Sequence, residues 1–463
     1  MTIIKNDLNG PKGKIPLGVK IAYGSGDMVA GLAFNALNFF YFFFLNTVVG
    51  LSPFLAGLVL LIGRVWDGFA DMLMGMIVDS TTAKRGKHRV WILVSIVPYV
   101  VTFFLLWVRY PGTDTAHFVI YSLLFILFSS AFTMYNIPYG SMTADLTQDY
   151  NERTGITGIR MVFSLFAMII GAGVTQLIAG IKPLGYPGMA VIFGVVMCAA
   201  GLTAYTATKG RDTVVKKSEG IKLGIWLQAF RNRPFVLLVS SYLLLTIATT
   251  GVSGIFIYFV KYNLRLTNDF SSSLIMGVLV LAAIAALPLW AVVSKKISKK
   301  AALFIGMAVF GAGLVAITAF GLSRGPVLFY ILSMIAGIGL SSFFIVLWSM
   351  IPDVVEYGQL QTGHRHEGVY YGLWFFVQKL GMALSATING WVLTRTGFKQ
   401  EQGGRLLEQT ATTLGGINLL LTWLPIAFIA VGLAILVFYP IDAAKHAQIR
   451  KELDNAAVPP SVQ

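Results

Sequence analysis

The chain contains 463 residues, of which 56% are hydrophobic and only 12% are charged, and its formal net charge at pH 7 is +15. So much apolar surface excludes a soluble domain, and runs of about 20 apolar residues are long enough to cross a bilayer as helices. Because these runs lack the period-2 alternation of a transmembrane barrel, the sequence predicts an all-α, multi-pass membrane protein.

Basic residues gather in alternate connections between the apolar runs, for example at 84–89 and 295–300. This bias is typical of cytoplasmic loops, so the positive charge orients the chain in the membrane and does not indicate a nucleic-acid partner. We expect an integral plasma (inner) membrane protein with both termini in the cytoplasm, and with membrane lipid around it.

Twelve apolar segments in two groups of six are predicted to span the membrane. The spans are expected near residues 17–48, 52–78, 90–108, 117–144, 157–180, 187–208, 234–262, 270–294, 301–322, 326–352, 368–394 and 416–440. This gives an N-terminal six-helix bundle at 1–208, a cytoplasmic linker at 209–233, a C-terminal six-helix bundle at 234–440 and a cytoplasmic tail at 441–463. Similar sequences end spans four and ten, at 141–145 and 349–353, as expected if the two bundles are structural repeats.

In span one, Asp27 lies among aromatic residues and near Asn35 and Asn38. Carboxylate and amide groups can bond the hydroxyls of a polyol, and aromatic faces can stack on the C–H surfaces of a sugar ring. Asp27 is therefore a candidate substrate-binding residue. A capping or interface position near the cytoplasmic end of the span is an equally weighted alternative.

Span two contains two acidic residues, Asp67 and Asp71, four positions apart. On a helix their side chains lie on one face, one turn apart, where two bare carboxylates at membrane depth would repel each other and lack hydration. A bound Na⁺, a proton or a lysine from another span would relieve the repulsion. We therefore predict a cation-coupling site; the alternative is a purely structural pairing with Arg64 and Lys379.

The turn after span two combines an acid with a basic run and resembles the loop signature of the major facilitator superfamily. An acid at one helix end can bind basic residues across two bundles and act as a conformational gate. The residues that we assign to this gate, together with the charged residues near the ends of spans four and ten, are Asp79, Arg85, Lys87, Arg89, Asp145, Arg153 and Asp353.

Span four carries the sequence Asn136-Ile137-Pro138-Tyr139-Gly140, which is predicted to break the helix because proline removes a backbone donor. Asn136 and Tyr139 are candidate substrate contacts, although a simple packing kink is at least as good an interpretation. Arg160, at the start of span five, either points into the cavity or lies in the headgroup zone.

Span eleven carries Lys379 well inside the apolar run, too deep to reach either interface easily. Its ammonium group needs a carboxylate or a cation site as a neighbour. Trp374 and Gln378, which precede it, are added to the candidate substrate contacts.

With these residues assembled, the chain resembles the melibiose carrier-like glycoside–pentoside–hexuronide:cation symporters of the major facilitator superfamily. The resemblance runs through nearly the whole chain and rests on the motifs at 23–27, 48–52, 64–71, 136–141, 146–149, 152–153, 353–358 and 378–379. It implies the major facilitator fold.

The resemblance also implies roles for individual residues. Asp67 and Asp71 match the cation-site acids, Thr133 matches a supporting cation ligand and Lys379 the lysine beside that site, while Arg160 matches an arginine near the sugar. At three positions where galactoside carriers of this family have substrate-binding side chains, this chain has Gly31, Asn136 and Gly140 instead. Galactoside contacts are therefore not expected.

These observations predict a cation-coupled symporter of a sugar or glycoside that works by alternating access. The coupling ion is Na⁺ or H⁺, with Na⁺ placed at Asp67 and Asp71, and no cofactor, enzymatic activity or oligomeric partner is expected beyond a monomer. The alternative on the same fold is transport of a lysolipid or another organic solute, whose chain could lie along the aromatic segment 39–44. A membrane sensor or scaffold is a third interpretation.

Overall fold

A computed structural model describes residues 15–83, 86–147, 150–212, 229–266, 269–321, 326–364, 367–399 and 407–457, and every regular element within these ranges is a helix. The α-helices are α1 (Leu17–Gly24), α2 (Asp27–Ala36), α3 (Pro53–Ser80), α4 (Arg89–Leu106), α5 (Asp114–Leu146), α6 (Tyr150–Ile169), α7 (Thr175–Ala179), α8 (Gly185–Ala207), α10 (Arg233–Tyr258), α11 (Asp269–Lys296), α12 (Lys299–Phe320), α13 (Pro326–Thr362), α14 (Glu367–Arg395), α15 (Ala411–Asn418), α16 (Leu424–Val437) and α17 (Ala443–Ala457). Short π-helical segments are η1 (Leu37–Tyr41), η2 (Phe44–Val49), η3 (Ile170–Val174), η4 (Phe259–Asn263) and η5 (Leu419–Trp423).

Ten of the twelve predicted spans correspond to helices among the described residues that are long and apolar enough to cross a membrane. The other two predicted spans are the first, which is interrupted, and α14, which has 29 residues but is more polar. The chain is therefore an integral multi-pass membrane protein.

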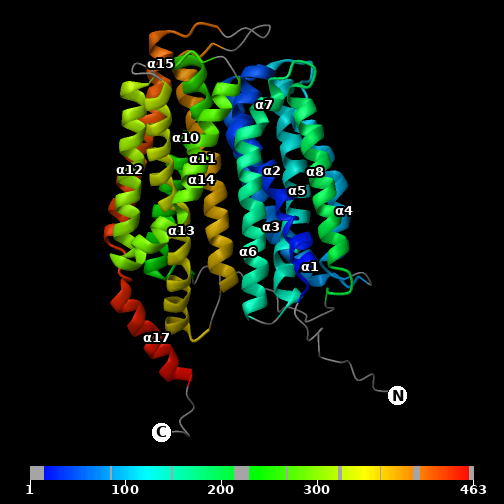
Figure 1. The fold of residues 1–463 in the computed structure, drawn as a ribbon, viewed down its shortest axis with the longest axis vertical. Coiled ribbons are helices and arrows are strands. Elements are labelled where there is room, and N and C mark those ends of the chain that lie inside the picture. Colours follow the sequence, from blue (N-terminus) through cyan, green and yellow to red (C-terminus); the bar gives the residue numbers. More distant parts are fainter. Residues whose placement is uncertain are drawn as a thin grey trace. The chain divides into compact units, whose positions relative to one another are not determined.

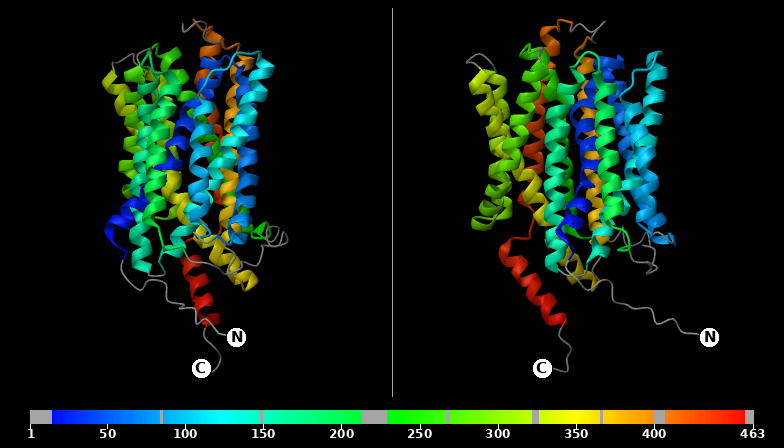
Figure 2. Two further views of the ribbon diagram at one scale, coloured as in Figure 1. Left: turned by 90° about the vertical axis from the view of Figure 1, so that its right-hand side faces the viewer. Right: turned by 45° about the vertical axis from the view of Figure 1, so that its right-hand side comes forward.

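The helices pack into two compact units. Unit 1 comprises Met1–Leu37 and Trp66–Gly220, and unit 2 comprises Asn38–Val65 and Ile221–Gln463. Within each unit the long helices run alongside one another (Figure 1). Helix α17 extends beyond the end of the other helices of unit 2 (Figure 2).

Residues 38–65, which the sequence prediction assigned to the first bundle, pack within unit 2. The first half of α3 lies against α14 through glycine: a side chain at Gly57 would meet the carbonyl oxygen of Ala386 at 2.7 Å. One hydroxyl bonds a backbone group across this contact, because the Phe54 N–H donates to Thr394 Oγ1 at 3.1 Å. Thr387 Oγ1 lies 3.3 Å from the Gly57 carbonyl but only 3.0 Å from the Ala383 carbonyl of its own helix. Small residues thus let the two backbones approach closely, as in many membrane helix pairs.

Span one is interrupted, and span four is not. The first span consists of α1, a turn at Ser25 and Gly26, α2 and then two π-helical segments. Helix α5, in contrast, continues from Asp114 to Leu146 with Pro138 inside it. The predicted break in span four was therefore wrong; a membrane helix can contain a proline when neighbouring groups satisfy the freed carbonyl.

Candidate functional site

The acid pair of span two lies in unit 1, in the second half of α3. Asp67 is 2% exposed, and Asp71, one turn further along the same helical face, is half-buried. Thr133 of α5 is 1% exposed and faces both, with its Oγ1 at 2.6 Å from Asp71 Oδ1 and 3.2 Å from Asp67 Oδ1. Two carboxylates and a hydroxyl thus converge below the surface of unit 1.

The chemistry of this convergence favours a cation. Three oxygen donors from Asp67, Asp71 and Thr133 offer the ligand type that hard cations prefer. A hydroxyl has a single hydrogen, so Thr133 can donate to only one of the two carboxylates at a time. The shorter distance assigns that hydrogen to Asp71.

The two basic residues considered as partners of the acids lie in unit 2. Arg64 is in the first half of α3 and is 7% exposed, and Lys379 in α14 is 9% exposed. Both side chains are therefore buried in helices that cross the membrane, as the sequence predicted for Lys379.

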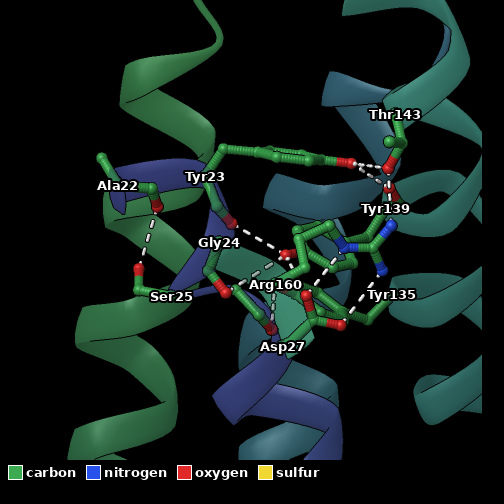
Figure 3. Close-up of polar contacts among 10 residues, drawn as sticks. Ala22, Tyr23, Gly24, Ser25, Asp27, Tyr135, Tyr139, Thr143 and Arg160 are labelled. Carbon is green, nitrogen blue, oxygen red and sulfur yellow. Dashed lines mark hydrogen bonds and ion pairs between the residues drawn. The ribbon is translucent and has the colours of Figure 1, made fainter. Parts of the chain in front are cut away.

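A second polar cluster in unit 1 is built around Asp27 and Arg160 (Figure 3). Arg160 of α6 donates hydrogen bonds to both carboxylate oxygens of Asp27, from Nε to Oδ2 at 2.7 Å and from Nη2 to Oδ1 at 3.0 Å. Its third nitrogen, Nη1, donates to Thr143 Oγ1 at 2.5 Å. Such a bidentate pair fixes both planar groups and is one of the stronger hydrogen-bonded arrangements in proteins.

Tyrosine side chains surround this ion pair. The Tyr139 hydroxyl lies 2.9 Å from Asp27 Oδ2 and 2.8 Å from the Tyr23 carbonyl, and its single hydrogen can bond only one of them at a time. The guanidinium of Arg160 lies over the Tyr139 ring at 4.7 Å. Tyr23 packs against Tyr139 with ring centroids 4.8 Å apart, and its hydroxyl bonds Thr143 Oγ1 at 2.9 Å. Asp27, Tyr139 and Arg160, three of the predicted substrate contacts, therefore form one cluster, and Asn136 is half-buried one turn before Tyr139 on α5.

The other two predicted substrate contacts lie in unit 2, on α14. Trp374 is completely buried, with its ring stacked on Tyr242 at 3.6 Å and edge-on to Trp348 at 6.1 Å. Gln378, one turn further along, is half-buried. Trp374 thus belongs to an aromatic stack in this conformation rather than to an open surface.

The predicted gating residues have diverse surroundings. Arg89 begins α4, is 7% exposed and donates from Nη2 to the Tyr205 carbonyl at 3.0 Å. Lys87 is half-buried. Arg85 lies outside the described residues, as do the side chains of Asp79, Asp145 and Arg153.

Sequence reasoning missed Asp212, which follows α8. Its carboxylate is 1% exposed and accepts from the backbone N–H groups of His88 and Arg89 at 2.8 and 2.9 Å and bonds His88 Nδ1 at 2.9 Å. Burial alone would raise the pKa of Asp212, but the bonds from His88 and Arg89 outweigh it and lower the pKa below its usual value. Gly86 leaves space for this carboxylate, since any Cβ there would collide with it.

Asp353 of α13 binds the start of α12 and also faces α17. Lys299 Nζ lies 2.6 Å from Asp353 Oδ2, and His446 Nε2 lies 3.5 Å from Oδ1. The neighbouring Glu356 binds His446 at 2.9 Å and Arg450 at 3.1 Å. The role of α17 in this charged cluster was not predicted, because no sequence pattern indicates which carboxylates a terminal helix contacts.

The described helices define an all-α, multi-pass membrane protein. The nucleoside transporter NupG, a solved structure 15% identical in sequence, matches this fold over 90% of this chain and 99% of its own with a TM-score of 0.64. The family model described as MFS/sugar transport protein matches residues 22–443. The chain therefore belongs to the MFS/sugar transport protein family.

Curated relatives cover nearly the whole chain. The glucuronide carrier protein homolog of Escherichia coli is 30% identical over 94% of this chain and 95% of its own. The sodium-dependent lysophosphatidylcholine symporter 1-A of Danio rerio is 26% identical over 94% of this chain and 87% of its own. The predicted family resemblance is thereby confirmed, and relatives named as symporters agree with cation-coupled transport.

Proposed function

We propose that the protein couples the movement of Na⁺ or H⁺ to the transport of a sugar or glycoside by alternating access. The observation that carries this proposal is the single Thr133 hydroxyl within 3.2 Å of both carboxylates of the acid pair. A cation arriving at Asp67 and Asp71 would be bound by both and by Thr133, and would remove their repulsion. Binding would then favour the conformational change that carries the solute.

Either coupling ion fits this chemistry. A proton shared by two neighbouring carboxylates lowers their repulsion, as Na⁺ would, and the pair then titrates as a unit. The relative from Danio rerio is named sodium-dependent, which favours Na⁺ as the first ion to test. Lys379 is proposed as a further residue that takes part in cation coupling.

The Asp27–Arg160 cluster is proposed as the substrate site. The opposite charges of the bidentate pair cancel, so the cluster offers fixed donors and acceptors without net charge. This arrangement suits neutral hydroxyls better than a second carboxylate, which would compete with Asp27 for Arg160. We therefore favour a neutral glycoside over a glucuronide as the solute. The further proposed substrate contacts are Asn136, Tyr139, Trp374 and Gln378.

Transport of a lysolipid is the alternative, in line with the name of the Danio rerio relative. The aromatic segment that would accommodate its chain, 39–44, is at most 6% exposed in this structure. An acyl chain would have to open this segment before it could bind. For this reason we favour a sugar or glycoside over a lysolipid as the solute.

We further propose that the protein acts as a monomer. During alternating access its two halves, at 1–208 and 234–440, would move as bodies joined by the linker at 209–233. Both termini would lie in the cytoplasm of the plasma (inner) membrane, as the basic connections indicate. Asp79, Arg85, Lys87, Arg89, Asp145, Arg153 and Asp353 would form the charged gate on that side.

Thermal unfolding of the purified protein in detergent tests this proposal. Methyl β-D-glucoside, methyl β-D-glucuronide and lysophosphatidylcholine are each added with and without NaCl, with choline chloride as the ionic-strength control. A ligand that binds the folded state raises the unfolding temperature, and we expect the largest rise for the glucoside in the presence of Na⁺ or at low pH. If only lysophosphatidylcholine raises the unfolding temperature, the transported solute is a lysolipid and not a sugar.

A further inference from the structure

The interruption of span one is a tightened helical turn, not a disordered loop. Three backbone bonds span three residues instead of four: Gly26 N–H to the Tyr23 carbonyl at 3.0 Å, Met28 N–H to Ser25 at 3.0 Å and Val29 N–H to Gly26 at 3.1 Å. A stretch of this kind inside a helix often marks a hinge. Asp27 lies in its centre, so the path of the turn determines where this carboxylate points.

Two tyrosine hydroxyls from α5 bond the carbonyl groups of this turn (Figure 3). Tyr135 donates to the Gly26 carbonyl at 3.0 Å, and Tyr139 donates to the Tyr23 carbonyl at 2.8 Å. Both side chains are completely buried. Each bonded carbonyl already accepts one backbone N–H, so the tyrosines use its second lone pair and hold the tightened conformation in place.

The turn and the tyrosines fit each other closely. A Cβ at Gly26 would lie 2.8 Å from the Tyr135 hydroxyl and would overlap the Tyr139 ring. The two rings stack with centroids 5.4 Å apart and an interplanar angle of 17°. Only a residue without a side chain therefore allows the α5 hydroxyls to reach the carbonyls.

We propose that Tyr135 is a positioning residue for solute binding, which holds the 23–29 turn of span one so that Asp27 meets Arg160 in the bidentate geometry. This inference rests on the proposed role of Asp27 and Arg160 in binding the solute. The Tyr135 hydroxyl contacts the backbone, whereas the Tyr139 hydroxyl lies near both the Tyr23 carbonyl and the Asp27 carboxylate and can give its one hydrogen to either. Tyr135 thus separates the positioning effect from direct contact with the site.

Tyr99 provides a matched control for the loss of a buried tyrosine hydroxyl. Its ring stacks on Tyr135 at 6.3 Å, it is completely buried, and its hydroxyl donates to the Val29 carbonyl at 3.1 Å. Val29 lies in α2, one turn beyond Gly26. Tyr99→Phe therefore removes a bond of the same type and length from a carbonyl that accepts none of the three tightened backbone bonds.

The experiment compares Tyr135→Phe, Tyr99→Phe and the unchanged protein in two measurements. Hydrogen exchange followed by mass spectrometry reports the backbone amides of residues 23–30. Uptake of radiolabelled methyl β-D-glucoside into proteoliposomes gives KM and the maximal rate separately. We expect Tyr135→Phe alone to accelerate exchange in this segment and to raise KM about fivefold, the effect of losing roughly one hydrogen bond, with little change in the maximal rate.

Three results would contradict the positioning role of Tyr135. Unchanged exchange in Tyr135→Phe, equal changes in KM for both variants, or faster exchange without a change in KM would each overturn the positioning role. If the unchanged protein takes up no glucoside, the proposed solute class fails. In that case the inference is tested by hydrogen exchange and thermal stability of Tyr135→Phe, Asp27→Asn and the double variant. If the effects of the two single substitutions add up to the effect of the double variant, Tyr135 does not act through Asp27.

Discussion

Unit 1 contains two carboxylate sites with different neighbours. Asp27 is held by two nitrogens of Arg160, one on each carboxylate oxygen. Asp67 and Asp71 both lie within 3.2 Å of the Thr133 hydroxyl, which donates its single hydrogen to one of them at a time. In the proposed function, the Asp27–Arg160 pair is a fixed site that orients a ligand, and Asp67 and Asp71 form a changeable site whose charge state alters with an incoming ion.

Removing charge from the changeable site should have the largest effect. We expect Asp71→Asn and Asp67→Asn to reduce gradient-driven accumulation to the background of empty vesicles, because a single remaining carboxylate no longer needs a cation to offset its neighbour. Exchange of labelled for unlabelled solute can survive. Accumulation and exchange in proteoliposomes measure this. Asp114→Asn, at an exposed position of α5, is the control, and full accumulation by the double variant Asp67→Asn/Asp71→Asn would remove the basis for coupling.

Breaking the fixed pair should cost both stability and transport. Arg160→Ala leaves the Asp27 carboxylate largely buried without its main partner, which costs about 3 kcal/mol of unfolding free energy, while Asp27→Ala/Arg160→Ala should recover much of that stability. Transport should be lost in both variants because the donors are gone. Denaturation in detergent and uptake measure the two effects. Equal stability of all three proteins would show that the pair is not a buried ion pair in solution.

Thr133→Ala should weaken cation dependence by an intermediate amount. A hydrogen bond to a charged group contributes about 1.5–3 kcal/mol, so the cation concentration for half-maximal transport should rise about tenfold, while the KM for the solute changes less. Thr133→Ser keeps the hydroxyl and should remain close to the unchanged protein. Uptake measured over a range of Na⁺ concentrations and pH gives these values. An equal loss in both variants would point to packing of the threonine methyl group instead.

Asp212 extends the comparison to a carboxylate without a proposed role in transport. Because its folded pKa lies below the unfolded value of about 4, its stabilising contribution is full above that value and is lost as the pH falls through the folded pKa. Asp212→Asn should therefore lower stability by about 1–2 kcal/mol at neutral pH, with a smaller deficit in acid. Unfolding temperatures of both proteins across this pH range measure it; a deficit independent of pH would contradict the ionised carboxylate as its cause.

The sequence predicted the apolar spans and the acid pair because both depend on local periodicity. Two acids four residues apart share a helical face in any context, and Asp71 and Asp67 do so here. Pro138 misled the prediction, since the composition of a segment does not show whether neighbouring helices will satisfy a freed carbonyl. Thr133, as the partner of the acid pair, came only from the family resemblance. Roles for these residues remain predictions.

Contacts between residues far apart in the chain could not be predicted. Asp212 binds His88 across 124 positions, and Arg160 binds Asp27 across 133. Several other charged residues were equally plausible partners in each case, and only the packing of the helices selects among them. The tightened turn at Gly26 shows the same limit, because its conformation depends on tyrosines more than 100 positions away.

The contact between the first half of α3 and α14 has a consequence for the speed of movement. At Gly57 the α3 backbone faces the backbone of α14 with no side chain between them, and a side chain at Gly390 would likewise collide with the backbone at Pro53. Backbones that meet at glycines can separate and close again at those positions without any rotamer change, while the bond from Phe54 N–H to Thr394 would exchange with water. We expect a larger residue at either glycine to keep the two helices apart and to hinder their closure.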